Sequence, residues 1–491
     1  MKKVEKGEDT GSGKGNLTNT LIRVSVASSL LSMQHGYNLW VVYSPSVLMQ
    51  DFYNVSQLEE MKQNENHMLL MGITFALFPL GGICGTLTVG YLVDTFGRKG
   101  ALIVTGFLSL ISSVLMGISG VIHAYEYTMF ARFYTGICTG IISSVVPLYI
   151  GEIAPRNLRG GGVTIPLLFL NIGVLLAQIA ALREILGNSK GLPFLLGLSG
   201  LLPLTELALL FSCPESPRYL LIQKRDEKGA REALKNLREK RNVEDEIEEL
   251  RQEDLAERTE KAMTTFRLLS NQNMRWHVIT IVALMAGQQL SGINAAYYYT
   301  ERIYMSTKVG ADNVRYIAIA STAVLCISIS LAVTLADSMG RRFLLLIGFG
   351  ICSIICILIT MTLEMQDTIP EMTYVSTILV DTFLFGHTLG PGPVPPVLTV
   401  ELFLQSARSS AFVIAGFLQW LLNFFTGVSF YYIETRIGPY SFLIFWPICV
   451  ATFSYVFKMV PETKDRTFLD VRRIMAIHTA RKIQVQAPAG K

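Results

Sequence analysis

Charge is scarce in this sequence, and that scarcity argues against an ordinary soluble protein. Asp, Glu, Lys and Arg make up only 16% of the 491 residues, whereas hydrophobic residues make up 51%. Soluble globular domains carry about 25% charge. The net charge of +4 is spread along the chain, without a basic patch of the kind that binds nucleic acid. We therefore expect an integral membrane protein whose partners are the lipid bilayer and a small molecule, not nucleic acid.

Catalytic and cofactor-binding patterns are also lacking. None of the seven cysteines has metal-ligand spacing with a histidine, so no metal site is predicted. The sequence has no constellation of nucleophile and base, and no glycine-rich nucleotide loop. We expect neither an enzyme nor a protein that uses a cofactor or ATP.

Long apolar stretches are abundant instead. A helix that crosses a bilayer needs about 20 mostly apolar residues. Stretches of this kind predict twelve spans, at 21–43, 68–92, 101–122, 125–150, 162–182, 192–213, 277–300, 313–337, 342–364, 374–399, 411–433 and 439–460. The fold class is therefore an all-α membrane protein.

The charge that the chain does have is concentrated between the sixth and seventh spans. Residues 214–276 hold 14 Lys and Arg and 14 Asp and Glu, in a pattern typical of short amphipathic helices. We interpret this segment as a structural linker on the membrane surface; a regulatory docking site is the alternative. The predicted organisation is a tail at 1–20, a six-helix half at 21–213, the linker at 214–276, a second half at 277–460 and a tail at 461–491.

Basic residues in the two tails predict the orientation in the membrane. Five lie in 1–23 and seven in 461–491, and cytoplasmic segments are enriched in Lys and Arg. We expect both termini and the linker in the cytoplasm. The loop 51–67 then lies outside, where Asn54 begins an Asn-Val-Ser glycosylation triplet.

The two predicted halves repeat each other in sequence. The repeats are DTFGRK (Asp94–Lys99) with DSMGRR (Asp337–Arg342) at an offset of 243, Glu152 and Arg159 with Glu401 and Arg408 at 249, and PESPR from Pro214 with PETKD from Pro461 at 247. Nearly equal offsets predict two halves related by an axis along the membrane normal, as in the major facilitator fold, with a cleft between them for alternating access.

The repeated charges lie where spans reach the cytoplasm. We expect them to form cross-helix ion pairs that hold the halves together on the inside and part when the inside opens, because charge buried without a partner is costly. The alternative is that they only anchor helix ends and set the topology. The candidate gate residues are Asp94, Arg98, Glu152, Arg159, Asp337, Arg341, Glu401 and Arg408.

The seventh span carries an unusual number of uncharged polar side chains. In LMAGQQLSGINAAYYYTERIY (284–304), the amides Gln288, Gln289 and Asn294 match the hydroxyls of a sugar, since an amide both donates and accepts. On a regular helix Gln289 and Asn294 would point about 140° apart. A break at Ser291–Gly292 would let them face one ligand. Bonds between neighbouring helices are the alternative role.

Several motifs in order resemble the facilitative hexose transporters, the sugar-porter branch of the major facilitator superfamily. They are GYLVDTFGRKG, PESPRYLL, GQQLSGINAAYYY, GPGPVP, VELF and VPETK, and the resemblance covers about 17–470. GHTLGPGPVP, with His387, and EELRQED look like the subgroup that holds the fructose transporter. The resemblance implies facilitative transport of a hexose, most of all fructose, by a monomer in the plasma membrane.

The same resemblance implies the sugar contacts. Matching positions are Gln288, Gln289, Asn294, His387, Trp420 and Asn423, with Gln419 before the tryptophan and His35 and Asn38 in the first-span QHGYN. Proton-coupled relatives have an aspartate where this chain has Asn38. An asparagine cannot exchange a proton at physiological pH, which favours uniport. Tyr297 to Tyr299 are candidates for an outer lid or for aromatic residues at the membrane interface.

The chain departs from the family at two further positions. Leu167 and Leu325 stand where glutamine and asparagine are usual, and each loss removes sugar hydrogen bonds worth about 0.5–1.5 kcal/mol apiece. The loss of these amides leaves three alternatives: a different hexose, a less polar solute, or a substrate that binds weakly.

Two other interpretations remain open. Arg132, deep in the fourth span, would suit an organic anion unless it pairs with Glu152. A non-transporting sugar sensor is the second, although such sensors have longer tails. Asp381 lies inside the tenth span or near its outer end, and an acid within a span is a functional hypothesis.

Overall fold

The computed structural model describes residues 15–41, 64–122, 124–188, 190–258, 263–297, 300 and 311–486. Within these ranges the chain is helical and has no strand. The helices of the first half are α1 (Asn19–Trp40), α3 (Asn64–Ile122), α4 (Tyr125–Ile153), α5 (Arg159–Ala180), α6 (Leu192–Gly197) and α7 (Leu201–Leu210). Those of the second half are α11 (Arg275–Leu290), α13 (Ala311–Ser338), α14 (Arg341–Met365), α15 (Met372–Leu389), α16 (Val394–Leu402), α17 (Gln405–Ile437) and α18 (Ser441–Met459).

Where their residues are described, the twelve predicted spans are mainly helical. Nine of the described helical segments are long and apolar enough to cross a bilayer. One of the nine, Ala76–Ile122, joins the second and third predicted spans, and the chain turns between them at Gly97, whose φ is 82°. Only glycine adopts such a φ readily. Exposed Phe194, Ile327 and Tyr91 on the flanks are expected where lipid replaces water.

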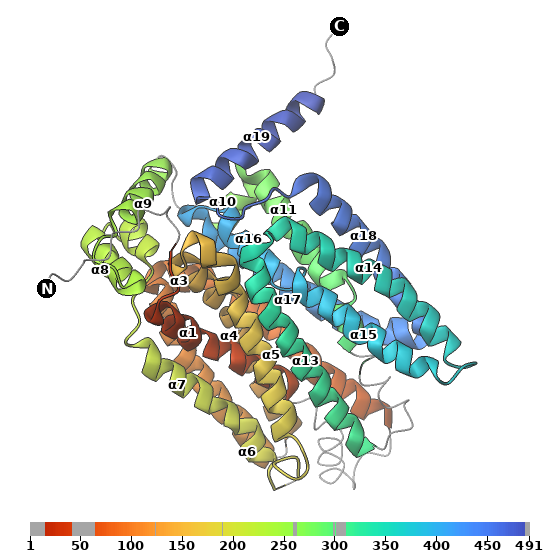
Figure 1. Ribbon diagram of the computed structural model, residues 1–491. Helices are drawn as coiled ribbons and strands as arrows, with labels where there is room; N and C mark the ends of the chain where they lie inside the picture. Colours follow the sequence, from red (N-terminus) through yellow and green to blue (C-terminus); the bar gives the residue numbers. More distant parts are fainter. Residues whose placement is uncertain are drawn as a thin grey trace, which may run out of the picture.

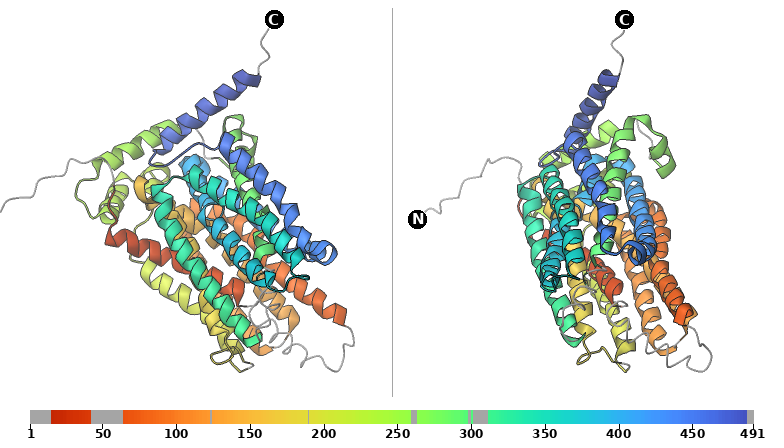
Figure 2. Two further views of the ribbon diagram at one scale, coloured as in Figure 1. Left: turned by 45° about the vertical axis from the view of Figure 1, so that its right-hand side comes forward. Right: turned by 90° about the vertical axis from the view of Figure 1, so that its right-hand side faces the viewer.

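The helices form two bundles that lie side by side (Figures 1 and 2). In the first, α3 packs on α4 and α1 on α5; in the second, α14 packs on α15 and α18, and α11 on α17. The bundles meet where α5 packs on α13 and α3 on α17. This arrangement agrees with the predicted fold class. The exact domain boundaries at 213, 276 and 460 stay a prediction.

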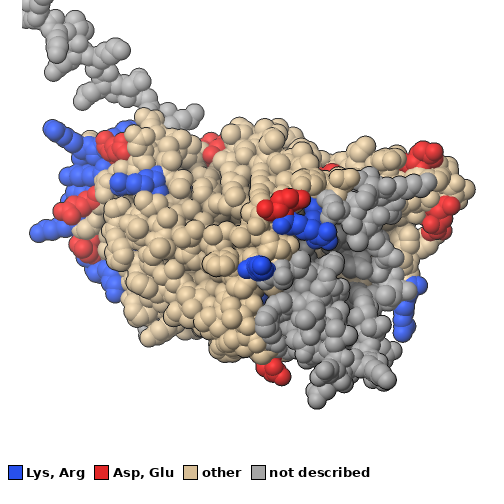
Figure 3. Space-filling view, turned by 90° about the horizontal axis from the view of Figure 1, so that it is seen from below, with Lys and Arg blue, Asp and Glu red and all other residues tan. Residues whose placement is uncertain are grey.

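Helices α8 (Glu227–Arg238), α9 (Glu244–Glu257), α10 (Thr265–Ser270) and α19 (Phe468–Gln486) all lie at one end of the tilted bundle, along its top and upper left side in Figure 1. We call this end the linker end. The opposite end, seen in Figure 3, is mainly uncharged where its residues are described, with a few charged side chains near the middle of the view and others at its edges. The predicted linker is therefore helical and caps one end of the span bundle.

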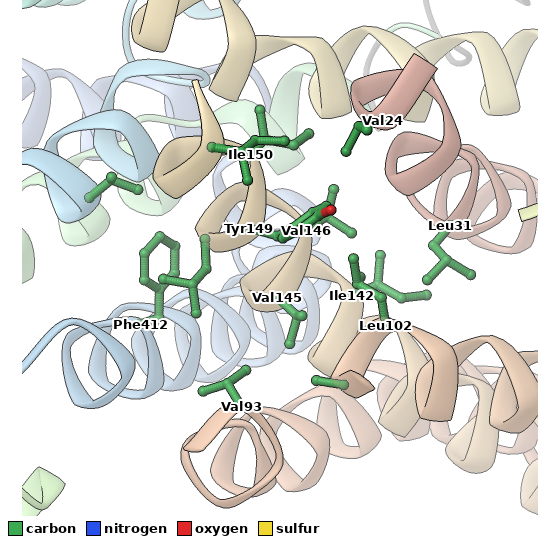
Figure 4. Close-up of a cluster of buried hydrophobic side chains, with 14 of the residues drawn as sticks. Val24, Leu31, Val93, Leu102, Ile142, Val145, Val146, Tyr149, Ile150 and Phe412 are labelled. Carbon is green, nitrogen blue, oxygen red and sulfur yellow. The ribbon is translucent and has the colours of Figure 1, made fainter. Parts of the chain in front are cut away.

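A buried apolar cluster near the linker end joins the two halves. Figure 4 shows Val145 and Ile142 of α4 between Leu31 of α1, Leu102 of α3 and Phe412 of α17. All five side chains are at most 3% exposed. Because α17 belongs to the second half, this cluster stabilises the contact between the halves in the conformation described here.

Two helices of the second half are interrupted. Helix α11 ends at Leu290, and Gly292 has a φ of 96° before helix resumes at residue 293. The predicted break at Ser291–Gly292 is thus confirmed. A Cβ on Gly292 would lie 3.1 Å from the Phe445 ring, so both backbone and space favour glycine. The tenth predicted span is also divided, into α15 and α16, at Gly390–Pro393.

Candidate functional site

The last turn of α11 presents Gln288 and Gln289 toward the break between α15 and α16. The Nε2 of Gln288 donates to the carbonyl of Gly392 at 2.8 Å, and the Nε2 of Gln289 donates to the Oε1 of Gln288 at 3.3 Å. The Oε1 of Gln289 is buried and has no hydrogen-bond partner among the described residues. Buried polar atoms are rarely left unpaired, so Gln289 has an accepting position available for a ligand.

His387, in the last turn of α15, lies next to the same glutamines. Its Nε2 is 3.2 Å from the carbonyl oxygen of Gln288. A Cβ on Gly392 would lie 3.5 Å from Cδ2 of Leu167, so α5 of the first half reaches this loop as well. The sequence positions of His387 and Leu167 do not show this proximity, which depends on the contact between the halves.

Asn294 faces α17 from beyond the break. Its Nδ2 donates to the Oγ1 of Thr426 at 2.6 Å, and the same hydroxyl lies 3.2 Å from the carbonyl of Asn423. Gln419, one turn earlier in α17, and Asn423 are half-buried. Thr426 was not a predicted site residue. Its only signal is the spacing of three from Asn423, which places both on one helix face.

An aromatic cluster joins the first half to α17. His35 of α1 lies 5.7 Å from Trp420 and 6.4 Å from Phe78 of α3, measured between ring centroids. The indole Nε1 of Trp420 donates to the Oγ of Ser143 of α4 at 3.3 Å. A Cβ on Gly82 of α3 would lie 2.4 Å from the Trp420 ring. Phe78 and Ser143 were missed because such residues are common in apolar spans.

Asn38 lies in α1, one turn beyond His35 of this cluster. Its side-chain Oδ1 is buried without a partner among the described residues, and its carbonyl accepts from Nη1 of Arg132 at 2.7 Å. The Arg132 guanidinium stands 4.4 Å from the centre of the Phe78 ring. The suggested pairing of Arg132 with Glu152 is wrong. Both residues belong to α4, and a helix places residues 20 positions apart at about 30 Å.

The repeated charges form matching clusters at the linker end. In the first half Arg98 donates to Glu152 at 2.9 Å and 3.1 Å, and to the carbonyl of Val93 at 3.1 Å. Neither side chain of the Arg98–Glu152 pair is exposed. The backbone N–H groups of Arg98 and Lys99 donate to Glu215 at 3.1 Å. A carboxylate at a helix start is stabilised by the helix dipole.

The second half repeats this arrangement. Arg341 donates to Glu401 and to the carbonyl of Ala336, both at 2.9 Å. The backbone N–H groups of Arg341 and Arg342 donate to Glu462 at 2.9 Å and 3.2 Å. Gly340 has a φ of 90°, as Gly97 does at the equivalent turn. The sequence repeat is therefore a repeat of local structure.

Three polar contacts cross between the halves at the linker end. Arg408 donates to Glu152 at 3.3 Å with neither side chain exposed. The Oγ of Ser409 donates to Asp94 at 3.3 Å, and the N–H of Gly161 donates to Asp337 at 2.8 Å. Asp94 and Asp337 thus accept from a hydroxyl and a backbone amide, not from the arginines that the sequence suggested. In this conformation the linker end is closed.

Arg159 differs most from its predicted role. The structure gives it no ion pair within the described residues, and its guanidinium stands 3.9 Å from the centre of the Phe468 ring of α19. Arg408 and Arg218 face the same ring at 4.3 Å and 4.7 Å. The two halves are therefore not equivalent. Arg408 of the second half pairs with Glu152 of the first half, whereas Arg159 of the first half lies over the Phe468 ring.

Other predicted residues lie apart from the amides. Tyr297 is 40% exposed, whereas Tyr298, Tyr299 and Asn54 lie outside the described residues. Asp381 is half-buried and accepts from the Oγ of Ser321 at 2.7 Å. It lines a cavity of about 260 Å³ between α13 and α15, together with Leu325. Leu325 therefore shares this cavity with the carboxylate of Asp381.

Two helical halves with a broken seventh span, and polar side chains between them, define a transporter of the major facilitator type. The solved structure of the major facilitator superfamily proton:xylose symporter XylE, bound to 6-bromo-6-deoxy-D-glucose, has the same fold: the TM-score is 0.81 at 22% identity, over 93% of this chain and 99% of that chain.

The chain belongs to the sugar (and other) transporter family, whose model matches residues 24–475. It is 44% identical over 471 residues to the human solute carrier family 2, facilitated glucose transporter member 5, covering 95% of this chain and 94% of that protein. Human member 7 is 43% identical, with coverage of 95% and 92%. The predicted resemblance and the prediction of a transporter, not an enzyme, are confirmed.

Proposed function

We propose that this protein is a facilitative transporter of a hexose, with fructose as the first candidate. The observation that carries the proposal is the group of uncharged amides around the broken seventh span. Gln288, Gln289 and Asn294 come from α11 and its continuation, and they face polar groups of α15 and α17. Fructose is chosen over glucose because of the resemblance around His387.

Sugar binding would exchange internal hydrogen bonds for bonds to hydroxyls. The Oε1 of Gln289 is available to accept from a sugar hydroxyl. The Asn294–Thr426 bond would open, so that its amide and hydroxyl each bond to the sugar. Trp420 and His35 would provide an apolar face for the ring carbons. A site of this kind binds reversibly, since each bond contributes only about 0.5–1.5 kcal/mol.

Uniport is proposed because the first span offers no proton carrier at the expected position. The side chain of Asn38 is an amide, and the backbone carbonyl of Asn38 accepts a hydrogen bond from Arg132. An amide does not titrate in the physiological range. Transport would then follow the sugar gradient alone.

Alternating access would depend on the contacts at the linker end. The Arg408–Glu152 pair, with the Asp94 and Asp337 contacts, joins the halves in this conformation. For sugar to leave on that side, these contacts must part. Arg98 and Arg341 pair within their own halves, so they would keep each half rigid while it moves.

We also propose that the protein acts as a monomer in the plasma membrane, with the linker end in the cytoplasm. The density of Lys and Arg in the tails and linker supports this orientation. The loop with Asn54 would then face outward and carry a glycan.

The test is uptake of labelled fructose and glucose, in parallel, by proteoliposomes of the purified protein, with and without an inward proton gradient. We expect saturable fructose uptake that is indifferent to the gradient. An Asn294→Ala variant should show a raised KM. Folded protein that takes up neither sugar would refute the hexose proposal, and uptake driven by the gradient would refute uniport.

A further inference from the structure

Glu206 is a carboxyl group buried in a predicted span. It lies in α7, where its exposed fraction is 0%. Both carboxyl oxygens lack a hydrogen-bond partner among the described residues. An ionised acid in this position would be costly, because nothing replaces the water it loses. A second group must therefore satisfy it.

The Glu206 carboxyl lies against the backbone of α3. A Cβ on Gly106 would be 2.6 Å from its Oε2. The register agrees, because Ser113 of α3 and Ser199 share a hydrogen bond of 3.0 Å. The two helices are antiparallel, so counting seven residues back from Ser113 and seven forward from Ser199 reaches Gly106 and Glu206 at the same level. The absence of a side chain at Gly106 makes room for the carboxyl.

Another unpaired polar atom lies on a helix that packs beside α7. The Oγ of Ser29 in α1 is buried without a hydrogen-bond partner among the described residues. The hydroxyl of Ser109 in α3 faces the thiol of Cys138 in α4 instead. The hydroxyl of Tyr37 in α1 donates to the carbonyl of Leu195 at 2.7 Å, and counting along both helices from this bond brings Ser29 within about one turn of the level of Glu206.

Among the described residues, no positively charged side chain bonds to this carboxyl. Arg23, Lys99 and Glu206 all lie close enough to Cys213 to act electrostatically on its thiol. Lys99 is used elsewhere, since its Nζ donates to the carbonyl of Phe211 at 3.0 Å. Glu206 forms no ion pair with any described residue. No side chain in the described part of the chain therefore supplies a counter-charge to Glu206.

We propose that Glu206 binds a proton and is a neutral carboxylic acid, and that it forms an internal water site with the hydroxyl of Ser29. A protonated carboxyl provides one donor and keeps an acceptor. A buried water makes about three hydrogen bonds to such groups. Together they satisfy the three unpaired atoms, the two carboxyl oxygens and the Ser29 hydroxyl, without any net charge in the membrane.

The bound proton stays in place during transport. Helices α1, α3 and α7 all belong to the first half, so rocking of the halves does not separate Glu206 from its neighbours. This step rests on the proposed uniport: the proton is structural, and sugar flux does not carry it across the membrane.

Infrared spectroscopy of the full-length protein tests the proton directly. The difference spectrum between wild type and Glu206→Gln should contain the carbonyl stretch of a protonated carboxylic acid, shifted in D₂O, at about pH 5 and about pH 8 alike. Glu371→Gln, which removes an exposed carboxyl, should instead remove carboxylate bands at about pH 8. Loss of carboxylate bands in Glu206→Gln would overturn the proposal, whatever the protein transports.

Stability and transport supply the second readout. Glu206→Gln keeps a neutral donor and acceptor, so its melting temperature should match wild type, whereas Glu206→Ala should melt earlier. Replacing Na⁺ with choline should change neither protein. Stabilisation by Na⁺ that is lost in Glu206→Gln would show a cation site and overturn the proton. Fructose uptake by Glu206→Gln should stay within about twofold of wild type; loss of uptake in folded protein would contradict a structural proton.

Discussion

Arg408 of the second half donates to Glu152 of the first at 3.3 Å, and neither side chain reaches the surface. The same carboxylate is held by Arg98 of its own half at 2.9 Å. Glu152 therefore bonds to two arginines, and only its bond to Arg408 must break when the halves separate. Because Arg98 remains, Glu152 is not left as an unpaired buried charge in the open state.

Replacing Arg408 with alanine should favour opening of the linker end. The variant loses the ion pair across the halves but keeps Arg98–Glu152. We expect a reporter cysteine at position 409, where Ser409 is buried against Asp94, to react at least about tenfold faster with a thiol reagent. That factor needs only about 1.4 kcal/mol, less than breaking a buried pair typically costs.

The matched control for this experiment is Arg342→Ala. Arg342 donates to the carbonyl of Phe457 within the second half, so its loss should leave labelling at position 409 unchanged. Equal acceleration in both variants would mean that general loosening, not the bond between the halves, governs access.

A methyl group at Gly82 should impair transport by displacing Trp420. The added Cβ would lie 2.4 Å from the indole ring, which must then move away from His35 and Ser143. We expect Gly82→Ala to reduce fructose kcat/KM by about tenfold or more, from overpacking that costs about 1–3 kcal/mol. The measurement is initial uptake against sugar concentration.

Gly427→Ala provides the comparison. Gly427 lies in α17, and a Cβ there would meet nothing within 4 Å. Alanine favours helix over glycine by up to about 1 kcal/mol, so this variant should transport normally and melt no earlier than wild type. Transport that survives Gly82→Ala unchanged would remove Trp420 from the proposed site.

Much of this architecture could be predicted from hydropathy and repetition. Apolar stretches of sufficient length identify the spans, and the repeated motifs identify the two groups of charged residues in which Arg98 bonds to Glu152 and Arg341 to Glu401. The sequence could not predict that Arg408 pairs with Glu152 and not with Glu401, since the two glutamates are equivalent in the repeat. It is decided by Phe468 and by the packing of the halves, which involve residues hundreds of positions apart.

The same limit applies to the candidate sugar site. The amides and the break at Gly292 are visible in sequence, because polar groups and glycine stand out in an apolar run. Phe78, Ser143 and Thr426 do not stand out, and only their contacts with Trp420 and Asn294 mark them. Nor does the sequence show that Glu206 is unpaired.

Restoring an amide at Leu167 should strengthen sugar binding. Leu167 lies near Gly392 and His387, where Gln288 is also bonded. One additional hydrogen bond contributes about 0.5–1.5 kcal/mol, or about two- to tenfold in affinity. We expect Leu167→Gln to lower KM for fructose by that factor. Leu176→Gln, on an exposed face of the same helix, should leave KM unchanged. If the two variants change KM equally, or if neither changes it, residue 167 does not contact the sugar.

Stability should fall as pH rises through the range in which Glu257 titrates. This residue ends α9, and its Oε2 accepts from the N–H of Ser406 at 3.1 Å at the start of α17. Burial raises the pKa of Glu257 from 4.5 to about 7. The folded protein therefore keeps this proton between about pH 4.5 and about 7 while the unfolded chain loses it, and stability declines with rising pH in that window.

The decline attributable to Glu257 is at most about 3 kcal/mol, and Glu257→Gln should abolish that part. The measurement is the melting temperature of detergent-solubilised protein at a series of pH values, with Glu232→Gln as the control because Glu232 is exposed on α8. If the melting temperature of the Glu257→Gln variant still falls as steeply as that of wild type, the decline belongs to another group. A flattened profile would show that the attachment of the linker to α17 strengthens as the linker end is acidified.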